Sequence, residues 1–215
     1  MTYKLKYRES EELCAILRNR PIVDYFLTRL RSHHIPTAEH SERVCTLSID
    51  LGIENGIKDT RLRLLGLAGL LHDIGKVAVP LEILSKNGPL TDDEWDYIRQ
   101  HPRMGFNMVS VYKDTVHHDV YVAGRLFVGH HEFKRSNLYP RNNEAQQDGE
   151  RIIYDRSGLL LTQLVAVSDI FDALAYERDY KPPLPFETVE NILRQDFTGN
   201  NNFVNQILIR HDGFS

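Results

Sequence analysis

The fold of this chain is decided by residues 70–105, which read LLHDIGKVAVPLEILSKNGPLTDDEWDYIRQHPRMG. An apolar helical segment ends at the start of this stretch. A new helix is predicted later in it, because Thr91 and Glu94 have the spacing of a capping box. Pro102 suits the first turn of a further helix. The stretch therefore predicts short helices separated by turns, with three residues of metal-ligand type near their ends: His72, Asp73 and His101.

Helical periodicity also dominates the sequence on both sides of this stretch. Strand signals are confined to a few β-branched residues near 77–79 and 151–154. We therefore expect an all-α fold, with a helical lead-in over residues 1–34 and the main domain over residues 35–215. The further helices are expected near residues 38–55, 60–72, 157–177, 186–196 and 202–211.

Composition narrows the class of protein. The 215 residues are 41% hydrophobic and 26% charged, which is ordinary for a globular domain with a buried core. A net charge of -4 lacks the basic footprint of a duplex nucleic-acid binder. Two cysteines make no disulfide framework, the N-terminus lacks the apolar run of a signal peptide, and no stretch reaches the length of a membrane span. We therefore expect a cytoplasmic protein.

The adjacent pair His72–Asp73 is the centre of the chemical argument. An imidazole nitrogen and a neighbouring carboxylate can bind cations together, and the carboxylate can bridge two of them. Mixed nitrogen and oxygen ligation suits iron, manganese, nickel or zinc better than calcium. The alternative is an ordinary polar pair at a helix C-terminus, where positive charge is favoured.

Two further residues are expected to point inward on apolar helix stripes. His40 shares its stripe with Val44, Leu47 and Leu51, and the alternative reading is a hydrogen-bonded core histidine. Asp169 is costly to bury without a partner, and either a metal or an arginine would satisfy it.

More histidines follow in the sequence. His130 and His131 are consecutive, so on a regular helix their side chains would diverge by about 100°. They could still flank one space from a helix end. The remaining histidines are interpreted as solvated surface: His33, His34, His117, His118 and His211.

The order of these motifs resembles the HD superfamily, and specifically its HD-GYP branch. The resemblance covers roughly residues 35–195. The matching segments are HSERV at 40–44, LLHDIGKVAVPLEILSKNGPLTDDEW at 70–95, HPRMG at 101–105, GHHE at 129–132 and VSDIFDALAYERDYK at 167–181. The resemblance implies an all-α bundle of the HD-domain type. It also implies two divalent transition-metal ions, iron or manganese most often, with nickel or zinc as alternatives.

The resemblance also assigns residues to roles. One metal would be held by His40, His72, Asp73 and Asp169, and Asp73 would bridge to a second metal held by His101, His130 and His131. The implied catalytic residues are Asp73 and Lys76, and the implied substrate contacts are Lys76, Tyr139, Arg178 and Lys181.

The implied reaction is hydrolysis of a cyclic dinucleotide, cyclic di-GMP to linear pGpG. One alternative is an HD phosphohydrolase that acts on a hybrid cyclic dinucleotide, a mononucleotide or a (p)ppGpp-like substrate. The other is a catalytically weak module that binds a cyclic dinucleotide and reports to a partner.

The sequence departs from the family pattern at two places. The motif after HHE runs approximately R-x-D-G-x-G-Y-P in the family, and here it reads FKRSNLYP, so Leu138 replaces a glycine. The loop over residues 133–148 is therefore a candidate contact for a protein partner. Some relatives bind a third metal through a glutamate four residues before the first histidine, and here that position is Pro36. We accordingly expect two metals and a reaction that stops at the linear dinucleotide.

Overall fold

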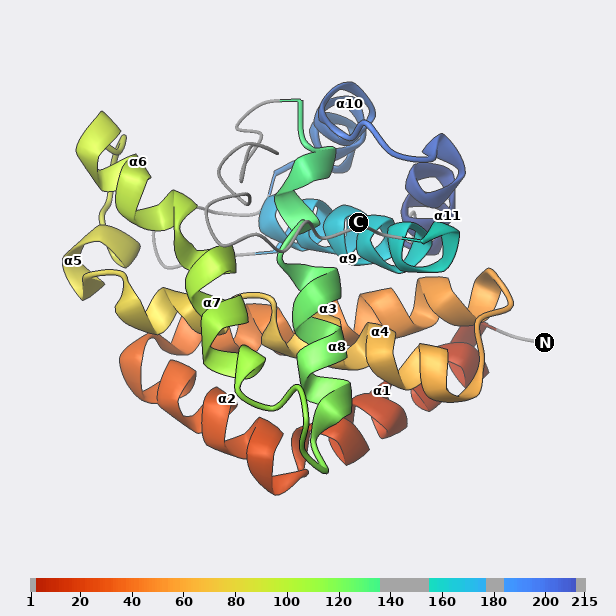
Figure 1. Cartoon of the computed structure of the whole chain (residues 1–215). Coiled ribbons are helices and arrows are strands. Elements are labelled where there is room, and N and C mark those ends of the chain that lie inside the picture. The colour runs from red at the N-terminus through yellow and green to blue at the C-terminus, as the bar shows by residue number, and fades with distance from the viewer. Residues whose placement is uncertain (1–2, 136–154, 177–183, 212–215) are drawn as a thin grey trace.

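A computed structural model describes residues 3–135, 155–176 and 184–211 (Figure 1). The regular elements of these residues are all helices, so the expectation of an all-α fold is confirmed. In chain order they are α1 (Tyr3–Arg18), α2 (Pro21–His33), α3 (Ile35–Glu54), α4 (Asp59–Leu71), the 3-10 helix η1 (Ile74–Ala78), α5 (Leu81–Leu84), α6 (Asp92–Arg99), α7 (His101–Ser110), α8 (His118–Phe127), the 3-10 helix η2 (His130–Phe133), α9 (Arg156–Ala175), α10 (Phe186–Asp196) and α11 (Asn201–His211).

Local signals in the sequence explain several helix ends. Thr91 and Glu94 form the predicted capping box at the start of α6. Pro102 lies in the first turn of α7 as expected. The extended piece expected at 77–79 is wrong, because these residues belong to η1 or follow it directly. The other expected extended piece, 151–154, lies outside the described residues.

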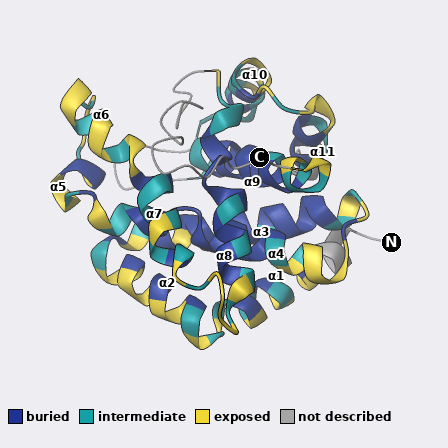
Figure 2. Cartoon of the chain, in the orientation of Figure 1, coloured by how far each residue is buried: buried dark blue, intermediate teal, exposed yellow. Residues whose placement is uncertain are grey.

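The core lies between the long central helices. Figure 2 shows α3 and α9 largely buried, while the outer side of α2 and much of α6 are exposed. Helices α3 and α4 approach closely at Gly69, where an added Cβ would lie 2.8 Å from the Cα of Cys45. Phe127 of α8 and Phe171 of α9 are fully buried in the same cluster as these two helices. This core fixes the positions of the helix ends that carry the site.

The two N-terminal helices share this core. Leu17 of α1 and Phe26 of α2 belong to the same buried cluster as α3 and α4. The hydroxyl of Ser10 also donates a hydrogen bond to the buried carboxylate of Asp50, at 2.6 Å. The lead-in expected over residues 1–34 therefore packs directly on the rest of the chain.

Helix α9 is long and apolar enough to cross a membrane, by length and composition alone. The expectation that no stretch reaches that length was therefore wrong for α9. In this structure 61% of its apolar window is buried inside the protein, and a helix in a protein core passes the same test. The feature is accordingly weak evidence for a span.

Candidate metal centre

Seven buried histidine and aspartate side chains meet at the ends of the central helices. His40 lies early in α3, His72 caps α4, and Asp73 precedes η1. His101 begins α7, the pair His130–His131 forms the first half of η2, and Asp169 lies in the second half of α9. These are the seven residues that the sequence singled out as metal ligands, and each is at most 7% exposed.

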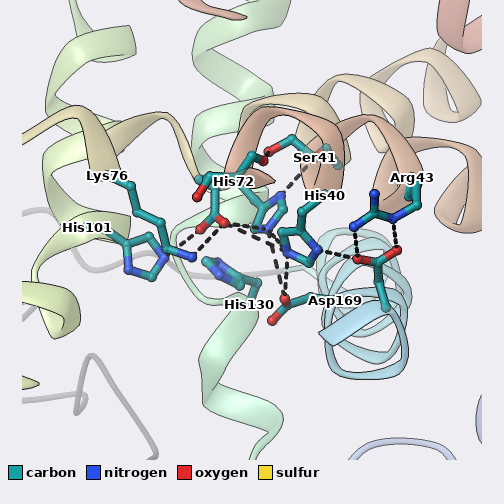
Figure 3. Close-up of polar contacts among 12 residues, drawn as sticks. His40, Ser41, Arg43, His72, Lys76, His101, His130 and Asp169 are labelled. Carbon is teal, nitrogen blue, oxygen red and sulfur yellow. Dashed lines mark hydrogen bonds and ion pairs between the residues drawn. The ribbon is translucent and has the colours of Figure 1, made fainter. Parts of the chain in front are cut away.

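The first group of side chains surrounds the Nε2 atom of His40. This atom lies 3.1 Å from Asp169 Oδ1 and 3.2 Å from His72 Nε2 (Figure 3). The Nδ1 atom of His72 donates to the carbonyl of Gly69 at 2.8 Å, so in a neutral ring its Nε2 is an acceptor. If Nε2 of His40 is an acceptor as well, a cation between these atoms would satisfy all of them.

Asp73 lies between two groups of histidines and turns one oxygen toward each. Its Oδ2 is 3.5 Å from His72 Nε2 and 3.8 Å from His40 Nε2, whereas its Oδ1 is 3.1 Å from His101 Nε2. A carboxylate with this arrangement is suited to bridging two cations.

The second group consists of His101, His130 and His131. One ring nitrogen from each lies within 4.8 Å of the others. The rings of His130 and His131 are only 4.0 Å apart between centroids, because the tight 3-10 turn of η2 lets both face the same space. This resolves the divergence expected for consecutive residues on a regular helix.

The backbone fixes which nitrogen these rings present. Nδ1 of His101 donates to the carbonyl of Ile98 at 2.7 Å, and Nδ1 of His130 donates to that of Phe127 at 2.5 Å. Neutral His130 therefore presents Nε2 as an acceptor, and this buried atom has no hydrogen-bond partner among the described residues. Holding Nδ1 so that Nε2 is free for a metal is the usual arrangement of metal-binding histidines.

His40 is held by a carboxylate instead of a carbonyl. Its Nδ1 donates to Asp172 Oδ2 at 2.6 Å, and the guanidinium of Arg43 donates to both oxygens of Asp172, at 2.7 and 3.0 Å. Sequence reasoning did not assign roles to Asp172 and Arg43. The available signal was the three-residue spacing of Asp169 and Asp172, which places both on one face of α9.

Burial sets the protonation of the histidines. It lowers the pKa of His72 to about 4, although the carboxylate of Asp73 opposes this. Burial likewise lowers the pKa of His101, His130 and His131. These imidazoles are therefore neutral near pH 7, which is the form that binds metals.

The carboxylates of the cluster are ionised. Burial alone would raise the pKa of Asp73 and Asp169, but nearby cations and histidines hold both well below the usual range. Lys76 Nζ lies 2.7 Å from Asp73 Oδ2, and Lys134 Nζ lies 2.9 Å from Asp169 Oδ2. An arginine had been expected as the alternative partner of Asp169, and the described residues place a lysine there. Sequence reasoning missed Lys134.

A cavity of about 930 Å³ opens beside this cluster. His40, His131 and Asp169 line it from the cluster, together with Lys76 and Lys134. Of the four expected substrate contacts, Lys76 therefore faces the cavity. The other three lie outside the described residues: Tyr139, Arg178 and Lys181.

The expectation that the remaining histidines are solvated surface was wrong for His34. This residue is 9% exposed, lines the cavity and shares a 2.7 Å hydrogen bond with Thr37. It lies between α2 and α3, where the chain turns inward. His33 is half-buried, with Nε2 donating to the carbonyl of Val79 at 2.8 Å.

Comparisons with known proteins place the chain among cyclic dinucleotide phosphodiesterases in sequence similarity. The family model described as HD domain matches residues 37–176. The chain is 36% identical to a cyclic di-GMP phosphodiesterase of Pseudomonas aeruginosa over 80% of its own length and 38% of the relative. It is 34% identical to a cyclic di-GMP phosphodiesterase of Thermotoga maritima over 70% of its length and 38% of the relative. It is 32% identical to a 3'3'-cGAMP-specific phosphodiesterase of Vibrio cholerae over 74% of its length and 32% of the relative. The chain thus spans about a third of the length of these curated relatives.

The fold also matches a solved structure. The HD domain of the L. monocytogenes phosphodiesterase PgpH, in complex with cyclic di-AMP, superposes with a TM-score of 0.57 at 18% sequence identity. The match covers 89% of this chain and 94% of that one. At this level of identity the likeness concerns the fold.

Proposed function

The chain belongs to the HD domain family, and we propose that it is a metal-dependent phosphodiesterase that hydrolyses a cyclic dinucleotide. The observation that carries this proposal is the way the histidines are held. Nδ1 of His40, His72, His101 and His130 donates to a carboxylate or a carbonyl, so Nε2 of each ring faces one of two candidate cation sites. A hydrogen bond at Nδ1 alone would also suit a core histidine, but the convergence of several such rings with Asp73 on the same space favours a cation.

The seven buried side chains fit two divalent ions. We assign His40, His72, Asp73 and Asp169 to one ion, and Asp73, His101, His130 and His131 to the other. Support comes from the two oxygens of Asp73, which face different histidines at 3.1 and 3.5 Å. Imidazole with carboxylate favours iron or manganese, with nickel or zinc as alternatives.

Two metals in such a site would supply a water of lowered pKa and would stabilise negative charge on a bound phosphate. The chain's own residues add to this. Asp73 would contribute one oxygen to each metal site. Lys76 lines the cavity, and its Nζ lies 2.7 Å from Asp73 Oδ2. A phosphate in the cavity would therefore meet a fixed positive charge. We propose Asp73 and Lys76 as catalytic residues.

The substrate class is inferred from the relatives. Two of them are named for cyclic di-GMP and one for 3'3'-cGAMP. We propose cyclic di-GMP as the substrate and linear pGpG as the product. Tyr139, Arg178 and Lys181 remain proposed substrate contacts, and the 133–148 loop remains a proposed contact for a protein partner. A cytoplasmic location also remains a proposal.

The surroundings of His40 support two metals and not three. Pro36 lies in the first turn of α3, lines the cavity and has no ligand atom. Glu39 is half-exposed and lies 3.9 Å from Arg31, whose guanidinium also pairs with Glu42 at 2.6 Å. Glu39 also lines the cavity, but both glutamates face Arg31, and we propose that neither takes the place of the carboxylate that Pro36 replaces.

Metal analysis followed by turnover tests this proposal. Protein purified without oxygen should hold close to two transition-metal ions per chain and should convert cyclic di-GMP to pGpG. The variants His72→Ala and Asp73→Asn should lose most metal and most activity. His118→Ala is the matched control, because His118 is an exposed histidine outside the cluster. Two bound metals without hydrolysis of cyclic di-GMP or 3'3'-cGAMP would contradict the proposed activity, and three metals in one cavity would contradict the binuclear assignment.

A further inference from the structure

The cavity continues beyond the metal centre to a wall of different chemistry. One part of the lining is the charged cluster, and another part comes from α5, α6 and the turn between them, which also contributes Lys86. We call this the apolar wall; it consists of Ile83, Leu84, Pro89, Leu90, Trp95 and Ile98. A cavity of about 930 Å³ is far larger than one phosphodiester group needs and is comparable to the pockets that hold whole organic ligands.

Trp95 is the residue of this wall that core packing does not explain. It is the single tryptophan of the chain and is only half-buried. Helix α6 contributes no buried residue to the protein. Val79, Ile83 and Leu84 form a small apolar cluster with Leu90 and Ile98, and Trp95 belongs neither to that cluster nor to the main core. Within residues 3–135, 155–176 and 184–211, no aromatic side chain packs on the Trp95 ring, although this ring lines the cavity.

Polar contacts hold the start of α6, and one cation lies against the Trp95 ring. The capping box fixes the start of α6, and Lys86 Nζ pairs with Glu94 at 2.6 Å. The guanidinium of Arg99 lies over the Trp95 ring, 5.9 Å from its centroid. Trp95 lines the cavity, whereas Arg99 does not. Trp95 therefore belongs to a wall that is built before any ligand enters.

We propose that Trp95 is a stacking platform for a nucleobase of the substrate. The inference rests on the proposed phosphodiesterase function and deepens it. The charged side of the cavity would take the phosphate, and the apolar wall would take the planar base. Because every base has a π face, such a platform selects nucleotides over simple phosphates without distinguishing guanine from adenine. Selection between bases then falls to other residues.

The single tryptophan makes the platform directly observable, because the intrinsic fluorescence excited at its absorption edge comes from Trp95 alone. Titration of the metal-loaded protein with pGpG should quench this fluorescence. Inorganic phosphate, which has no base, should not. Trp95→Ala should raise the KM for cyclic di-GMP about tenfold to a hundredfold, with kcat and metal content unchanged. Trp95→Phe should keep most of the affinity. Tyr97→Ala is the control, since Tyr97 is an exposed aromatic residue of the same helix that does not line the cavity.

The outcomes separate this inference from the proposed function. A wild-type KM in Trp95→Ala, or unchanged fluorescence on addition of pGpG while turnover proceeds, would overturn the platform alone. Quenching by pGpG in a protein that hydrolyses no cyclic dinucleotide would overturn the proposed activity and support the platform. An equal rise of KM in Tyr97→Ala would show that the wall is merely disturbed, which also overturns the assignment to Trp95.

Discussion

Replacing Asp172 by asparagine should weaken metal binding although Asp172 is not itself a proposed ligand. The side chain is fully buried, accepts a 2.6 Å hydrogen bond from His40 Nδ1 and accepts two from Arg43. Burial raises the pKa of Asp172, but His40 and Arg43 outweigh burial and leave the pKa below its ordinary value. The carboxylate is therefore ionised at neutral pH and holds His40 with Nε2 toward the cation site.

The size of the effect follows from this role. Loss of an outer partner of a metal-binding histidine typically costs tenfold to a hundredfold in affinity, or about 1.4–2.7 kcal/mol. We expect the upper part of this range, because Asp172→Asn removes a charge-assisted bond while keeping the side-chain volume. The cost in folding should stay below the ~3–5 kcal/mol of a broken buried pair. Arg43 is 30% exposed and lies 5.0 Å from the centroid of the Tyr176 ring, so its guanidinium keeps contact with water and with this ring after the change.

Competition with a chelator of known affinity measures this effect directly. Asp50→Asn is the matched control, because Asp50 is also a buried aspartate and accepts a 2.6 Å hydrogen bond from Ser10, away from the cluster. The control should lose some stability and no metal affinity. If Asp172→Asn binds metal as tightly as the wild type, or if both variants lose affinity equally, the positioning role of Asp172 is refuted.

Three further predictions follow from the site. Gly75→Ala should destabilise the protein by ~1–3 kcal/mol and lower its metal content, since the new Cβ would lie 1.9 Å from the carbonyl oxygen of His101. Unfolding in denaturant measures the loss of stability, and a midpoint equal to that of the wild type would contradict the prediction. The metal-free protein should lose stability on acidification. The pKa of His72 is about 4 in the fold against 6.5 ordinarily, so His72 takes up a proton at a higher pH in the unfolded chain than in the folded one. The neutral His72 therefore contributes about 3 kcal/mol to the free energy of unfolding, and this contribution is complete above pH 6.5 and lost toward pH 4. His72→Gln should make the free energy of unfolding less dependent on pH, and an unchanged pH dependence in this variant would contradict the role of His72. Arg178→Ala and Lys181→Ala should weaken binding of the cyclic dinucleotide with metal content intact; unchanged affinity in both variants would contradict their proposed role as substrate contacts.

The helices were predictable because their signals are local. Periodic apolar residues and the capping box placed helices at 60–72 and after Thr91, close to the observed α4 and α6. The 3-10 helices escaped prediction, since η1 contains β-branched residues that favour extended structure when packing is ignored. Packing decides the matter there, because η1 lies against the start of α7 at Gly75.

The site was predictable to the extent that each ligand candidate showed a local peculiarity. Asp169 is a carboxylate on an apolar helix, and His72 follows an apolar run. Which residues pair with one another left no such mark. Lys134 meets Asp169 across 35 residues, and Asp172 meets His40 across 132. His34 was misread for a related reason: its burial depends on how α2 and α3 join, which its polar neighbours do not reveal.

The wide separation of the cluster residues along the chain has a consequence for folding. His40 and Asp169 are 129 residues apart in sequence, yet their side chains are 3.1 Å apart in the fold. An unfolded chain brings such distant groups together only at a cost in loop entropy, so it offers no comparable site. An ion with affinity for the native state alone stabilises it by RT ln(1 + [M]/Kd), about 2.7 kcal/mol at a hundred times Kd. The melting temperature should therefore rise with metal concentration. The supply of metal would then set the stability of the folded protein as well as its catalytic activity.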